Sequence, residues 1–539
     1  MSEENNNTNN SRRSAIKGLL GVPFAAGVLW GAMAETSKKK KEKENMLETL
    51  NIDAKRPPND LVAGDPVRIG IIGFGIRGPQ LMKALGFVTK KWEENASPGA
   101  LAAFKEQEDL NVKVTGVCDV FEPRAKEAAD SWGCKIFKHH EELLASPDID
   151  AVVIATPDHW HIPMALKAIA AGKHVYCEKP MSHNIEETYA IRDAVKNNPQ
   201  IMFQVGHQHR QTQSFITAKD IIKKRILGHV SMVVTNTNRN SDNGAWQYNM
   251  YEDVPDSAID WDQFLGSAPK IPFNREHFFR WRKWWAYGSG LSGDLLVHDY
   301  DRINCVLEMG MPKYAVASGG IYTHNDGREV NDVLNVNLEY PEFSTGSSRE
   351  AGIEKGMTFV YSATLGNQYS RPTLLMGHDG TMELGNTLTV NADRNSTRFK
   401  EYIKDGRMDP GTPIYAYNPA AGEGTDAITS ATAKYFADKG LLWTYVDGKR
   451  VDSTNLHMKE WLNAIRKGDS SLLSCGIKEG FEEAMTAHMV GLSIKAGRRV
   501  EWDAAKEEIV ALPGEDLDEI LLQTNVGEYE SKKVISSAI

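Results

Sequence analysis

Cysteine is scarce in this sequence. The 539 residues include five, namely Cys118, Cys134, Cys177, Cys305 and Cys475. A small and odd number of cysteines does not support a disulfide framework, and three of the five lie on or beside predicted core strands. We therefore expect buried thiols, and we predict no metal site.

The sequence also lacks an excess of basic charge. Its formal net charge is −10, and its composition is 41% hydrophobic and 25% charged. An acidic chain is a poor partner for nucleic acid or for an anionic membrane, so we expect neither. The composition is typical of a soluble globular enzyme, and the length is sufficient for two substantial domains.

The apolar segment near the start, residues 18–34, is shorter than the ~20 residues of a spanning helix and contains four glycines. It follows Arg12-Arg13, a near match to a twin-arginine signal, and ends in Ala32-Met33-Ala34, which is typical of a cleavage site. We expect residues 1–34 to be a signal peptide, with the twin-arginine translocase as export partner and the periplasm as destination. An uncleaved anchor is the alternative. Residues 35–66 are polar and indicate a linker or N-terminal arm.

The most informative motif follows an apolar run at residues 67–72 and has the pattern G-x-G-x-x-G. A strand that leads into this pattern predicts the phosphate-binding turn of a dinucleotide fold. The first glycine allows the tight turn, the second lets the backbone approach a pyrophosphate, and the third lets the next helix pack closely. That helix would direct its free N–H groups at the phosphates. The predicted cofactor-binding residues here are Gly73, Phe74, Gly75, Ile76, Arg77 and Gly78.

An acidic residue should end the next strand and bind the adenosine ribose. Residues 112–118 indicate that strand, and Asp119 follows it. The 41 residues from Gly78 to Asp119 exceed the usual ~20, which we attribute to an insertion at about residues 87–110. A carboxylate there repels a 2′-phosphate, so we favour NAD over NADP as cofactor. An ordinary turn residue is the alternative interpretation of Asp119.

The hydrophobic pattern divides the rest of the chain in two. Up to residue 210, strands alternate with helices, which predicts a doubly wound parallel sheet in an α/β fold. From residue 211 to 539 the pattern indicates an α+β domain built on a mainly antiparallel sheet. His488 lies on the apolar face of the last long helix, so we expect a core histidine. The predicted strands are 135–137, 151–155, 174–177 and 201–205 in the first part, and 230–234, 315–322, 333–340 and 357–363 in the second; the predicted helices include 185–198, 457–466 and 480–496.

Two further motifs resemble those of one family. Glu178-Lys179-Pro180 ends a predicted strand, and Gly293-Asp294-Leu295-Leu296-Val297-His298 lies far downstream. Together with the glycine loop, they resemble the glucose–fructose oxidoreductase/inositol dehydrogenase (Gfo/Idh/MocA) family over roughly residues 67–500. The resemblance implies an N-terminal Rossmann domain, residues 67–210, that holds the nicotinamide. It also implies a C-terminal domain with an open-faced sheet, residues 211–539, that binds a sugar and pairs in a dimer or tetramer.

The same resemblance implies a catalytic set of Lys179, Asp294 and His298. The proline after Lys179 restricts that residue to extended conformations, which directs its amine to the carboxyl edge of the sheet, where ligands bind. Asp294 and His298 are four residues apart and would share one helix face. A histidine titrates near working pH and can accept a hydroxyl proton. A surface lysine and a capping pair are the alternative.

Further cofactor contacts are implied at Thr156, Pro157, His161 and Glu178. A turn proline and a histidine at a helix N-terminus are the alternative interpretation of Pro157 and His161. The chain departs from the family pattern at Leu296, where glycine is common, and this leucine would narrow the floor of the pocket without removing a catalytic group.

Candidate substrate residues come from two segments and from the end of the downstream motif. Residues 278–287 are rich in aromatic and basic side chains, which suit a sugar but also suit packing. Residues 206–210 leave the last strand of the parallel sheet and could reach the substrate. The candidates are His207, Arg210, Arg280, Trp284, Tyr287 and Asp301.

Export would constrain the function, because the periplasm has no free nicotinamide pool. The cofactor would be loaded before export, held tightly and recycled in place, and residues 45–66 could cover it. The first interpretation is an oxidoreductase acting on a hydroxyl of a sugar, sugar derivative or glycoside. The second is a redox-neutral glycoside hydrolase that oxidises a hydroxyl to a ketone, eliminates the aglycone, adds water and reduces the ketone again. It would need a second base, for which Asp301, His207 and Tyr287 are candidates. The third is a catalytically inactive sugar-binding protein.

Overall fold

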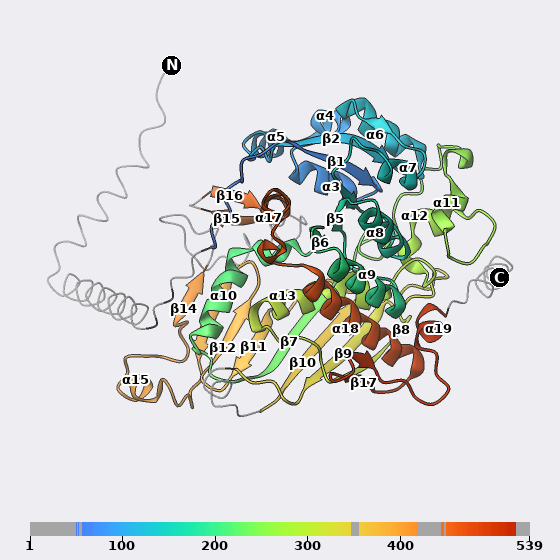
Figure 1. The fold of residues 1–539 in the computed structure, drawn as a ribbon. Helices are drawn as coiled ribbons and strands as arrows, with labels where there is room; N and C mark the ends of the chain where they lie inside the picture. Colours follow the sequence, from blue (N-terminus) through green and yellow to red (C-terminus); the bar gives the residue numbers. More distant parts are fainter. Residues whose placement is uncertain are drawn as a thin grey trace, which may run out of the picture.

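The computed structural model describes residues 50, 52, 56–345, 355–417, 443–446 and 449–523. The predicted signal peptide, residues 1–34, lies outside the described residues, as does most of the predicted arm up to residue 55. Two sheets organise the described chain, one above the other in Figure 1.

The first sheet is parallel and has six strands in the order β3-β2-β1-β4-β5-β6. Its central strands β1 and β4 are almost entirely buried, as is usual for strands covered by helices on both faces. The order reverses between β1 and β4, and ligands bind at such a switch point. The strands are β1 (Val67–Ile72), β2 (Val112–Cys118), β3 (Lys135–Ile136), β4 (Ala151–Ile154), β5 (His174–Cys177) and β6 (Phe203–Val205); the helices between them include α3 (Arg77–Ala84), α6 (Glu122–Trp132), α8 (His161–Ala170) and α9 (Ile185–Asn197).

The predicted insertion between the glycine motif and β2 contains two short helices, α4 (Lys90–Asn95) and α5 (Pro98–Lys105). The side chains of Thr89 and Ser97 accept the first free N–H groups of these helices, which is the usual role of an N-cap. The insertion therefore lengthens the connection without displacing β2 from its place beside β1.

The second sheet has ten strands in the order β14-β13-β12-β11-β7-β10-β9-β8-β17-β18. All neighbours are antiparallel except β7 and β10. In β10 every second residue is buried, and helices α10, α13 and α18 lie over one face of the sheet (Figure 1). The two sheets confirm the predicted fold class. The bounds are β7 (Val230–Asn238), β8 (Tyr314–Gly320), β9 (Val333–Tyr340), β10 (Met357–Thr364), β11 (Thr373–Gly377), β12 (Gly380–Leu384), β13 (Leu388–Ala392), β14 (Tyr415–Tyr417), β17 (Val500–Asp503), β18 (Glu508–Ile509), α10 (Gln213–Lys223), α13 (Val297–Leu307) and α18 (Ile477–Ala496).

One late helix crosses the predicted domain boundary. Helix α17 (Ser453–Lys467) follows the hairpin of β15 (Trp443–Val446) and β16 (Lys449–Asp452). Its Met458, Trp461 and Leu462 are buried in the same apolar cluster as residues of β1. Trp461 Nε1 also donates to the carbonyl of Met202 at 3.2 Å. The core of the first domain therefore includes a helix from the segment that the sequence pattern assigned to the second.

The described part of the N-terminal arm runs along α17. The side-chain oxygen of Asn463 accepts from the backbone N–H of Val62 at 2.8 Å, and its amide nitrogen donates to Asn59 at 3.0 Å. None of residues 56–66 lines the cavity described below. The Arg56 guanidinium instead donates to the carbonyl of Gln211 at 2.7 Å, and the expectation that residues 45–66 cover the nucleotide stays a prediction.

His488 is a core histidine, as predicted. It is buried in α18, and its Nε2 lies 3.1 Å from Ser182 Oγ and 3.2 Å from Thr188 Oγ1. Burial lowers the pKa of His488 to about 3, so the ring is neutral. All five cysteines are free thiols: three are buried, and Cys134 and Cys305 are half-buried.

Candidate functional site

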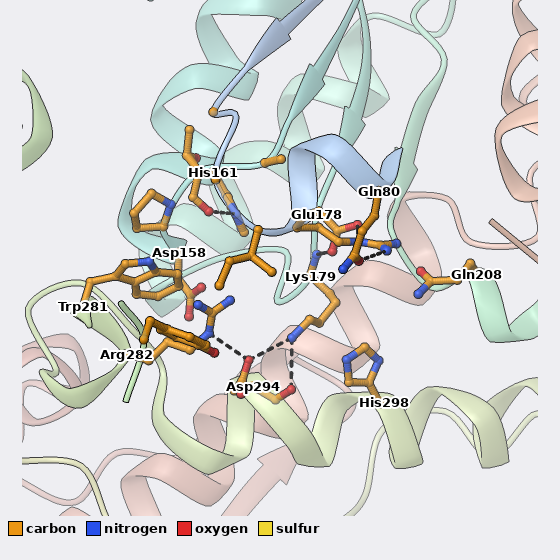
Figure 2. A pocket seen from close by; sticks show the side chains of 18 of the residues that line it. Gln80, Asp158, His161, Glu178, Lys179, Gln208, Trp281, Arg282, Asp294 and His298 are labelled. Carbon is orange, nitrogen blue, oxygen red and sulfur yellow. Dashed lines mark hydrogen bonds and ion pairs between the residues drawn. The ribbon is translucent and has the colours of Figure 1, made fainter. Parts of the chain in front are cut away.

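A cavity of about 770 Å³ lies where the carboxyl ends of β1, β4 and β5 face α13 and the ends of β7 and β11. Its walls include the glycine loop, the segment after β4, the Glu178-Lys179 pair and residues from the second sheet. The switch point of the parallel sheet and the substrate side of the second sheet thus open into one space, which is drawn from close by in Figure 2.

The glycine loop has the geometry of a phosphate cradle. Gly73 has a φ of +88°, and a Cβ on this residue would lie 2.7 Å from the carbonyl oxygen of Ala155. A Cβ on Gly78 would lie 2.4 Å from the carbonyl oxygen of Gly73. A Cβ on Gly75 would meet only the side chain of Arg124, at 3.6 Å. Gly73 and Gly78 are thus required by the backbone, whereas Gly75 leaves open space facing the cavity.

Helix α3 begins at Arg77 without a side-chain cap and without an acidic residue in its first turn. Its first N–H groups therefore remain available to an anion at the positive end of the helix. Together with the open face of Gly75, this arrangement fits the pyrophosphate of a dinucleotide.

Asp119 lies at the end of β2 and connects two loops at the cavity wall. Its Oδ2 accepts from the backbone N–H of Phe74 at 2.5 Å, and its Oδ1 accepts from that of Phe121 at 2.7 Å. Beside it, the Arg124 guanidinium lies over the rings of Phe121 and Tyr251, at 5.3 and 5.9 Å. These contacts hold the carboxylate at the edge where a ribose would lie, and its role in ribose binding stays a prediction.

Glu178 and Arg77 form an ion pair between β5 and α3, with Nε 2.8 Å from Oε1. Burial opposes ionisation, but the Arg77 guanidinium outweighs it and keeps the pKa of Glu178 below its usual value. A Cβ on Gly206 would lie 2.7 Å from Glu178 Oε1, so this glycine makes room for the pair. The pair fixes the start of α3 relative to the loop that carries Lys179.

His161 is buried at the start of α8 and connects two cavity loops. Its Nδ1 lies 2.7 Å from the carbonyl oxygen of Pro180, and its Nε2 lies 3.0 Å from that of Thr156. Thr156, Pro157 and His161 all line the cavity. His161 therefore supports the loop after β4 and the loop after β5, and it can position a ligand through both.

Lys179, Asp294 and His298 meet in the cavity. Lys179 Nζ lies 3.2 Å from Asp294 Oδ1 and 3.0 Å from the Asp294 carbonyl oxygen. Figure 2 shows Lys179 reaching toward the helix from which Asp294 and His298 point into the space. Asp294 belongs to η5 (Ser292–Leu296), one turn of π-helix directly before α13, and such turns are frequent at functional sites. Because His298 follows in the first turn of α13, both side chains face the same way.

Close packing holds this helix against the loop of Lys179. A Cβ on Gly293 would lie 2.4 Å from Ser289 Cβ and 3.1 Å from Pro180 Cγ. Leu296, which stands where the family often has glycine, is buried in the core of the second domain. Leu296 therefore does not line the cavity, and the expected narrowing of the pocket floor is wrong.

Asp294 is an ionised carboxylate among cations. Besides Lys179, Arg282 Nε lies 3.2 Å from Oδ1, Trp246 Nε1 donates to Oδ2 at 3.0 Å, and an Arg239 nitrogen lies 4.0 Å from Oδ2. Burial would raise its pKa, but Lys179, Arg282 and Arg239 outweigh burial and hold the pKa of Asp294 far below its usual value. Asp294 thus orients the lysine ammonium and balances its charge.

His298 is held neutral. Burial, followed by the positive charge of Lys179, lowers the pKa of His298 well below its usual value. His298 forms no hydrogen bond with any described residue, and its Nδ1 is enclosed. The ring centroid of His298 lies 5.9 Å from those of both His207 and His209. A neutral imidazole without a hydrogen bond is able to accept a proton from a ligand in the cavity.

The structure places the predicted substrate residues outside the cavity lining. Arg280 donates to the carbonyl of Tyr248 and to Glu276, Trp284 is fully buried against the ring of His277, and the Tyr287 hydroxyl lies 3.2 Å from His277 Nδ1. These three side chains thus pack the segment before η5.

His207, Arg210 and Asp301 form a buried cluster beneath His298. His207 Nδ1 lies 3.6 Å from Asp301 Oδ2, and Arg210 Nη2 lies 2.7 Å from Asp301 Oδ1. Although burial alone would lower it, the carboxylates of Asp301 and Glu483 raise the pKa of His207 above its usual value. The cluster fastens α13 to the segment after β6. His207, Asp301 and Tyr287 are the candidates for a second base, and none of them lines the cavity.

Neighbours of these residues line the cavity instead. They are Phe278, Phe279, Trp281 and Arg282 in the first segment and Gln208 and His209 in the second. Both segments form 3₁₀ turns, η4 (Trp281–Lys283) and η2 (Gln208–Gln211), where helical or strand periodicity gives no guide to direction. Composition could therefore identify the segments but not the side chains. Sequence reasoning also missed Asp158 and Asp299, which directly follow the predicted residues Pro157 and His298. The other lining residues that it missed have no local motif: Asn236, Arg239, Tyr248, Arg302 and Arg371.

No group of three or more His, Cys, Asp or Glu side chains in the described part of the chain is arranged to hold a metal ion. No described helix is both long enough and apolar enough to cross a membrane.

Two family models match the chain. One, described as "Oxidoreductase family, NAD-binding Rossmann fold", matches residues 67–207. The other, described as "Oxidoreductase family, C-terminal alpha/beta domain", matches residues 219–502. The two matches follow the two sheets of the structure, and the second alone covers more than half of the chain.

Known proteins are similar to parts of this chain. It is 30% identical over 188 residues to a levoglucosan dehydrogenase from Pseudarthrobacter phenanthrenivorans. This match covers 33% of the present chain and 40% of the relative. The chain is 34% identical over 142 residues to glycosyl hydrolase family 109 protein 2 from Shewanella sp. (strain ANA-3), which covers 24% of this chain and 26% of the relative. The chain thus spans less than half the length of both relatives. A solved structure of levoglucosan dehydrogenase in complex with NADH and levoglucosan has the same fold, with a TM-score of 0.52 at 19% identity over 83% of this chain and 100% of that one.

Proposed function

Because the chain belongs to the Gfo/Idh/MocA oxidoreductase family, with its NAD-binding Rossmann fold, we propose that it oxidises a hydroxyl group of a sugar, sugar derivative or glycoside to a carbonyl and returns the hydride to a carbonyl acceptor. The proposal includes a tightly held nicotinamide that is recycled in place. The observation that carries it is the convergence of Lys179, Asp294 and His298 in the cavity that the glycine loop also faces.

The three side chains have complementary parts in this reaction. His298 accepts the proton of the substrate hydroxyl while a hydride leaves the same carbon, and a carbonyl forms. Lys179 donates a hydrogen bond to the reacting oxygen and stabilises negative charge that develops on it. Asp294 holds Lys179 at 3.2 Å and directs its ammonium. The bound nicotinamide supplies the site that takes up the hydride and returns it.

The cofactor residues divide along the cavity in this proposal. The loop Gly73–Gly78 binds the pyrophosphate through its N–H groups from Gly75 onward, because those of Gly73 and Phe74 already donate to Cys118 and Asp119. Asp119 binds the adenosine ribose in NAD and disfavours a 2′-phosphate. Thr156, Pro157 and His161 lie near the nicotinamide, with Glu178 behind them, bound to Arg77. These assignments rest on the distances above and on the family's cofactor.

Export and assembly are further parts of the proposal. The twin-arginine motif supports export of the folded, cofactor-loaded protein to the periplasm through the translocase. Such a location requires the captive cofactor, because a periplasmic enzyme could not exchange it. The family resemblance supports a dimer or tetramer formed through the second sheet.

A redox-neutral glycoside hydrolase is the second candidate, and the likeness to a glycosyl hydrolase family 109 protein favours it. In that reaction the oxidised carbon acidifies its neighbouring C–H, the aglycone is eliminated, water adds, and the ketone is reduced. It needs a second base in the cavity. Asp158 lines the cavity and could serve, whereas His209 lines it but accepts a hydrogen bond from Arg302 at its Nε2. His207, Asp301 and Tyr287 do not line the cavity.

The test uses the purified full chain with its bound cofactor. Sugars and glycosides are added singly while the near-ultraviolet absorbance of reduced nicotinamide and the products are followed. A lasting rise, reversed by a second sugar, is expected for the oxidoreductase. Release of a free sugar with little lasting rise, and with solvent hydrogen incorporated beside the leaving group, would favour the hydrolase instead.

A matched pair of variants links the result to the site. His298→Asn should keep the cofactor and slow its reduction by about 10²- to 10⁴-fold, the usual contribution of a general base. His378→Asn, on an exposed turn between β11 and β12, should behave as the wild type. Equal rates in both variants would contradict the assignment, and absence of any bound nucleotide would contradict the proposed function.

A further inference from the structure

The cavity has more positive than negative side chains, although the whole chain has a net charge of −10. Among the described residues, seven lysines or arginines line it against five aspartates or glutamates. The pyrophosphate of a dinucleotide at the glycine loop would balance two of these positive charges, so the positions of the cations, and not their number, indicate whether a second anion binds. The cations are Arg77, Arg124, Lys179, Arg239, Arg282, Arg302 and Arg371, and the anions are Asp119, Asp158, Glu178, Asp294 and Asp299.

Four of the cations have a carboxylate partner within the protein. Arg77 pairs with Glu178 at 2.8 Å, and Arg302 pairs with Asp299 at 3.2 Å. Lys179 and Arg282 share Asp294 at 3.2 Å each. Arg124 lies beside Gly75 and is stacked on aromatic rings, so it faces the cofactor side. Arg239 and Arg371 remain, and both come from the second sheet.

Arg239 directly follows β7, and its backbone N–H donates to the carbonyl of Thr364 at 2.9 Å. Its side chain is 39% exposed, and its one ion pair with a described carboxylate is a 4.0 Å approach to Asp294. That carboxylate already accepts bonds from Lys179, Arg282 and Trp246, so Arg239 is the fourth and most distant of its donors. Its guanidinium therefore retains hydrogen-bonding capacity toward the cavity.

Arg371 precedes β11 and is held by its backbone. The side chain of Asn236 accepts from the Arg371 N–H at 3.2 Å and donates to its carbonyl at 3.0 Å. The Arg371 guanidinium bonds to the Ser362 hydroxyl at 3.0 Å and forms no ion pair with any described carboxylate. Because β7 lies beside β11 in the sheet, Arg239 and Arg371 reach the cavity from the same edge.

Two guanidinium groups with free donors on one wall are suited to an oxyanion, since each can form two parallel hydrogen bonds to it. We propose that the substrate is an anionic sugar whose carboxylate, sulfate or phosphate group binds to Arg239 and Arg371. The reacting hydroxyl of the sugar then lies at Lys179 and His298. The Arg239 guanidinium is close to this point, because it and Lys179 approach the same Asp294 carboxylate. This inference rests on the proposed function and names the substrate class of the same site.

The test compares sugars that differ only in charge. The neutral methyl glycoside of glucose is compared with its 6-carboxylate, 6-sulfate and 6-phosphate derivatives. The same four compounds are used for galactose and for mannose. Reduction of the bound nicotinamide is followed for the wild type, Arg239→Gln and Arg371→Gln. Arg394→Gln, an exposed position in the loop after β13, serves as the matched control for loss of a surface charge.

We expect the wild type to prefer one anionic series by at least about 10-fold in kcat/KM. Each cavity variant should lower the ratio of kcat/KM for that series to kcat/KM for the neutral sugars by about 10- to 100-fold. Arg371→Gln, which is remote from Asp294 in charge pairing, should change the neutral sugars by less than about 3-fold, whereas Arg239→Gln also removes a charge beside Asp294 and is judged by the ratio alone. The control should change neither, and the anionic preference should decline as salt is added. The series that is preferred identifies the oxyanion.

Equal use of neutral and anionic sugars by the wild type, with no effect of either cavity variant, would overturn the inference and leave the proposed function standing. Absence of nicotinamide reduction with every sugar in a protein that holds its cofactor would overturn both. Circular dichroism and cofactor retention check that each variant is folded before its rate is compared.

Discussion

Replacing Gly75 with alanine should separate cofactor binding from folding. A Cβ at this position meets nothing nearer than an Arg124 nitrogen at 3.6 Å, and the backbone is not in the left-handed region. The alanine therefore fits the folded chain without strain. It restricts the unfolded chain, which should leave the cofactor-free protein as stable as the wild type or more stable by up to about 1 kcal/mol.

The same methyl group projects into the space that the pyrophosphate is proposed to occupy. Displacing the phosphates by this distance should lengthen one or two charge-assisted hydrogen bonds to the loop N–H groups, each worth about 1.5–3 kcal/mol. We expect NADH to bind about 2–4 kcal/mol more weakly, which corresponds to roughly 30- to 1,000-fold in Kd.

Gly78→Ala is the matched comparison. Its Cβ would lie 2.4 Å from the carbonyl oxygen of Gly73, so the backbone must shift. That strain should cost about 1–3 kcal/mol of stability and weaken binding as well. Urea unfolding of the cofactor-free proteins and calorimetric titration with NADH measure both quantities. Unchanged NADH affinity in Gly75→Ala would refute the placement of the pyrophosphate beside Gly75.

Three further outcomes follow from the site and the core. Asp294→Asn should lower the free energy of unfolding by about 3 kcal/mol or more and reduce kcat, because Lys179 and Arg282 lose their shared counter-ion; urea unfolding and steady-state rates measure this. The folded pKa of His298 lies below the ~6.5 of the unfolded chain, so its contribution to stability is complete above pH 6.5 and declines as pH falls. Relative to His298→Asn, the free energy of unfolding of the wild type should fall by up to about 1.4 kcal/mol for each pH unit below 6.5, which urea unfolding at pH 7.5 and 5.5 measures. Trp461→Ala should destabilise the first domain by about 3–5 kcal/mol and weaken NADH binding, and equal thermal unfolding of variant and wild type would contradict the packing of α17.

Local pattern predicts those parts of the chain whose structure depends on local chemistry. The residues of β9 alternate strictly between inward and outward positions, and the predicted strand at 333–340 has the bounds of the observed one. The glycine loop was predictable because a positive φ at Gly73 and the close contact at Gly78 admit no other residue. Lys179, Asp294 and His298 were found through two motifs, and the structure brings them together.

Other features depend on contacts between distant segments and leave no local trace. Trp284 and Trp281 are equally aromatic in sequence, yet Trp284 is fully buried and Trp281 lines the cavity, because the 3₁₀ turn ends at Lys283 and Trp284 continues with an extended backbone. Arg239 and Arg371 lie 132 residues apart, and the pairing of β7 with β11 brings both to the cavity. Helix α17 has an ordinary amphipathic pattern that does not specify which sheet it will cover.

The position of α17 has a consequence for synthesis on the ribosome. The parallel sheet is complete in sequence by Val205, but the helix that closes one side of its core ends at Lys467. At about 5–20 residues per second, the ribosome needs roughly 13–50 s to make the residues between them. During that time the buried faces of β1 and β5 lack part of their cover, and a nascent chain is exposed to association with others. The nucleotide domain, although it is encoded first, is therefore among the last parts of the molecule to become complete.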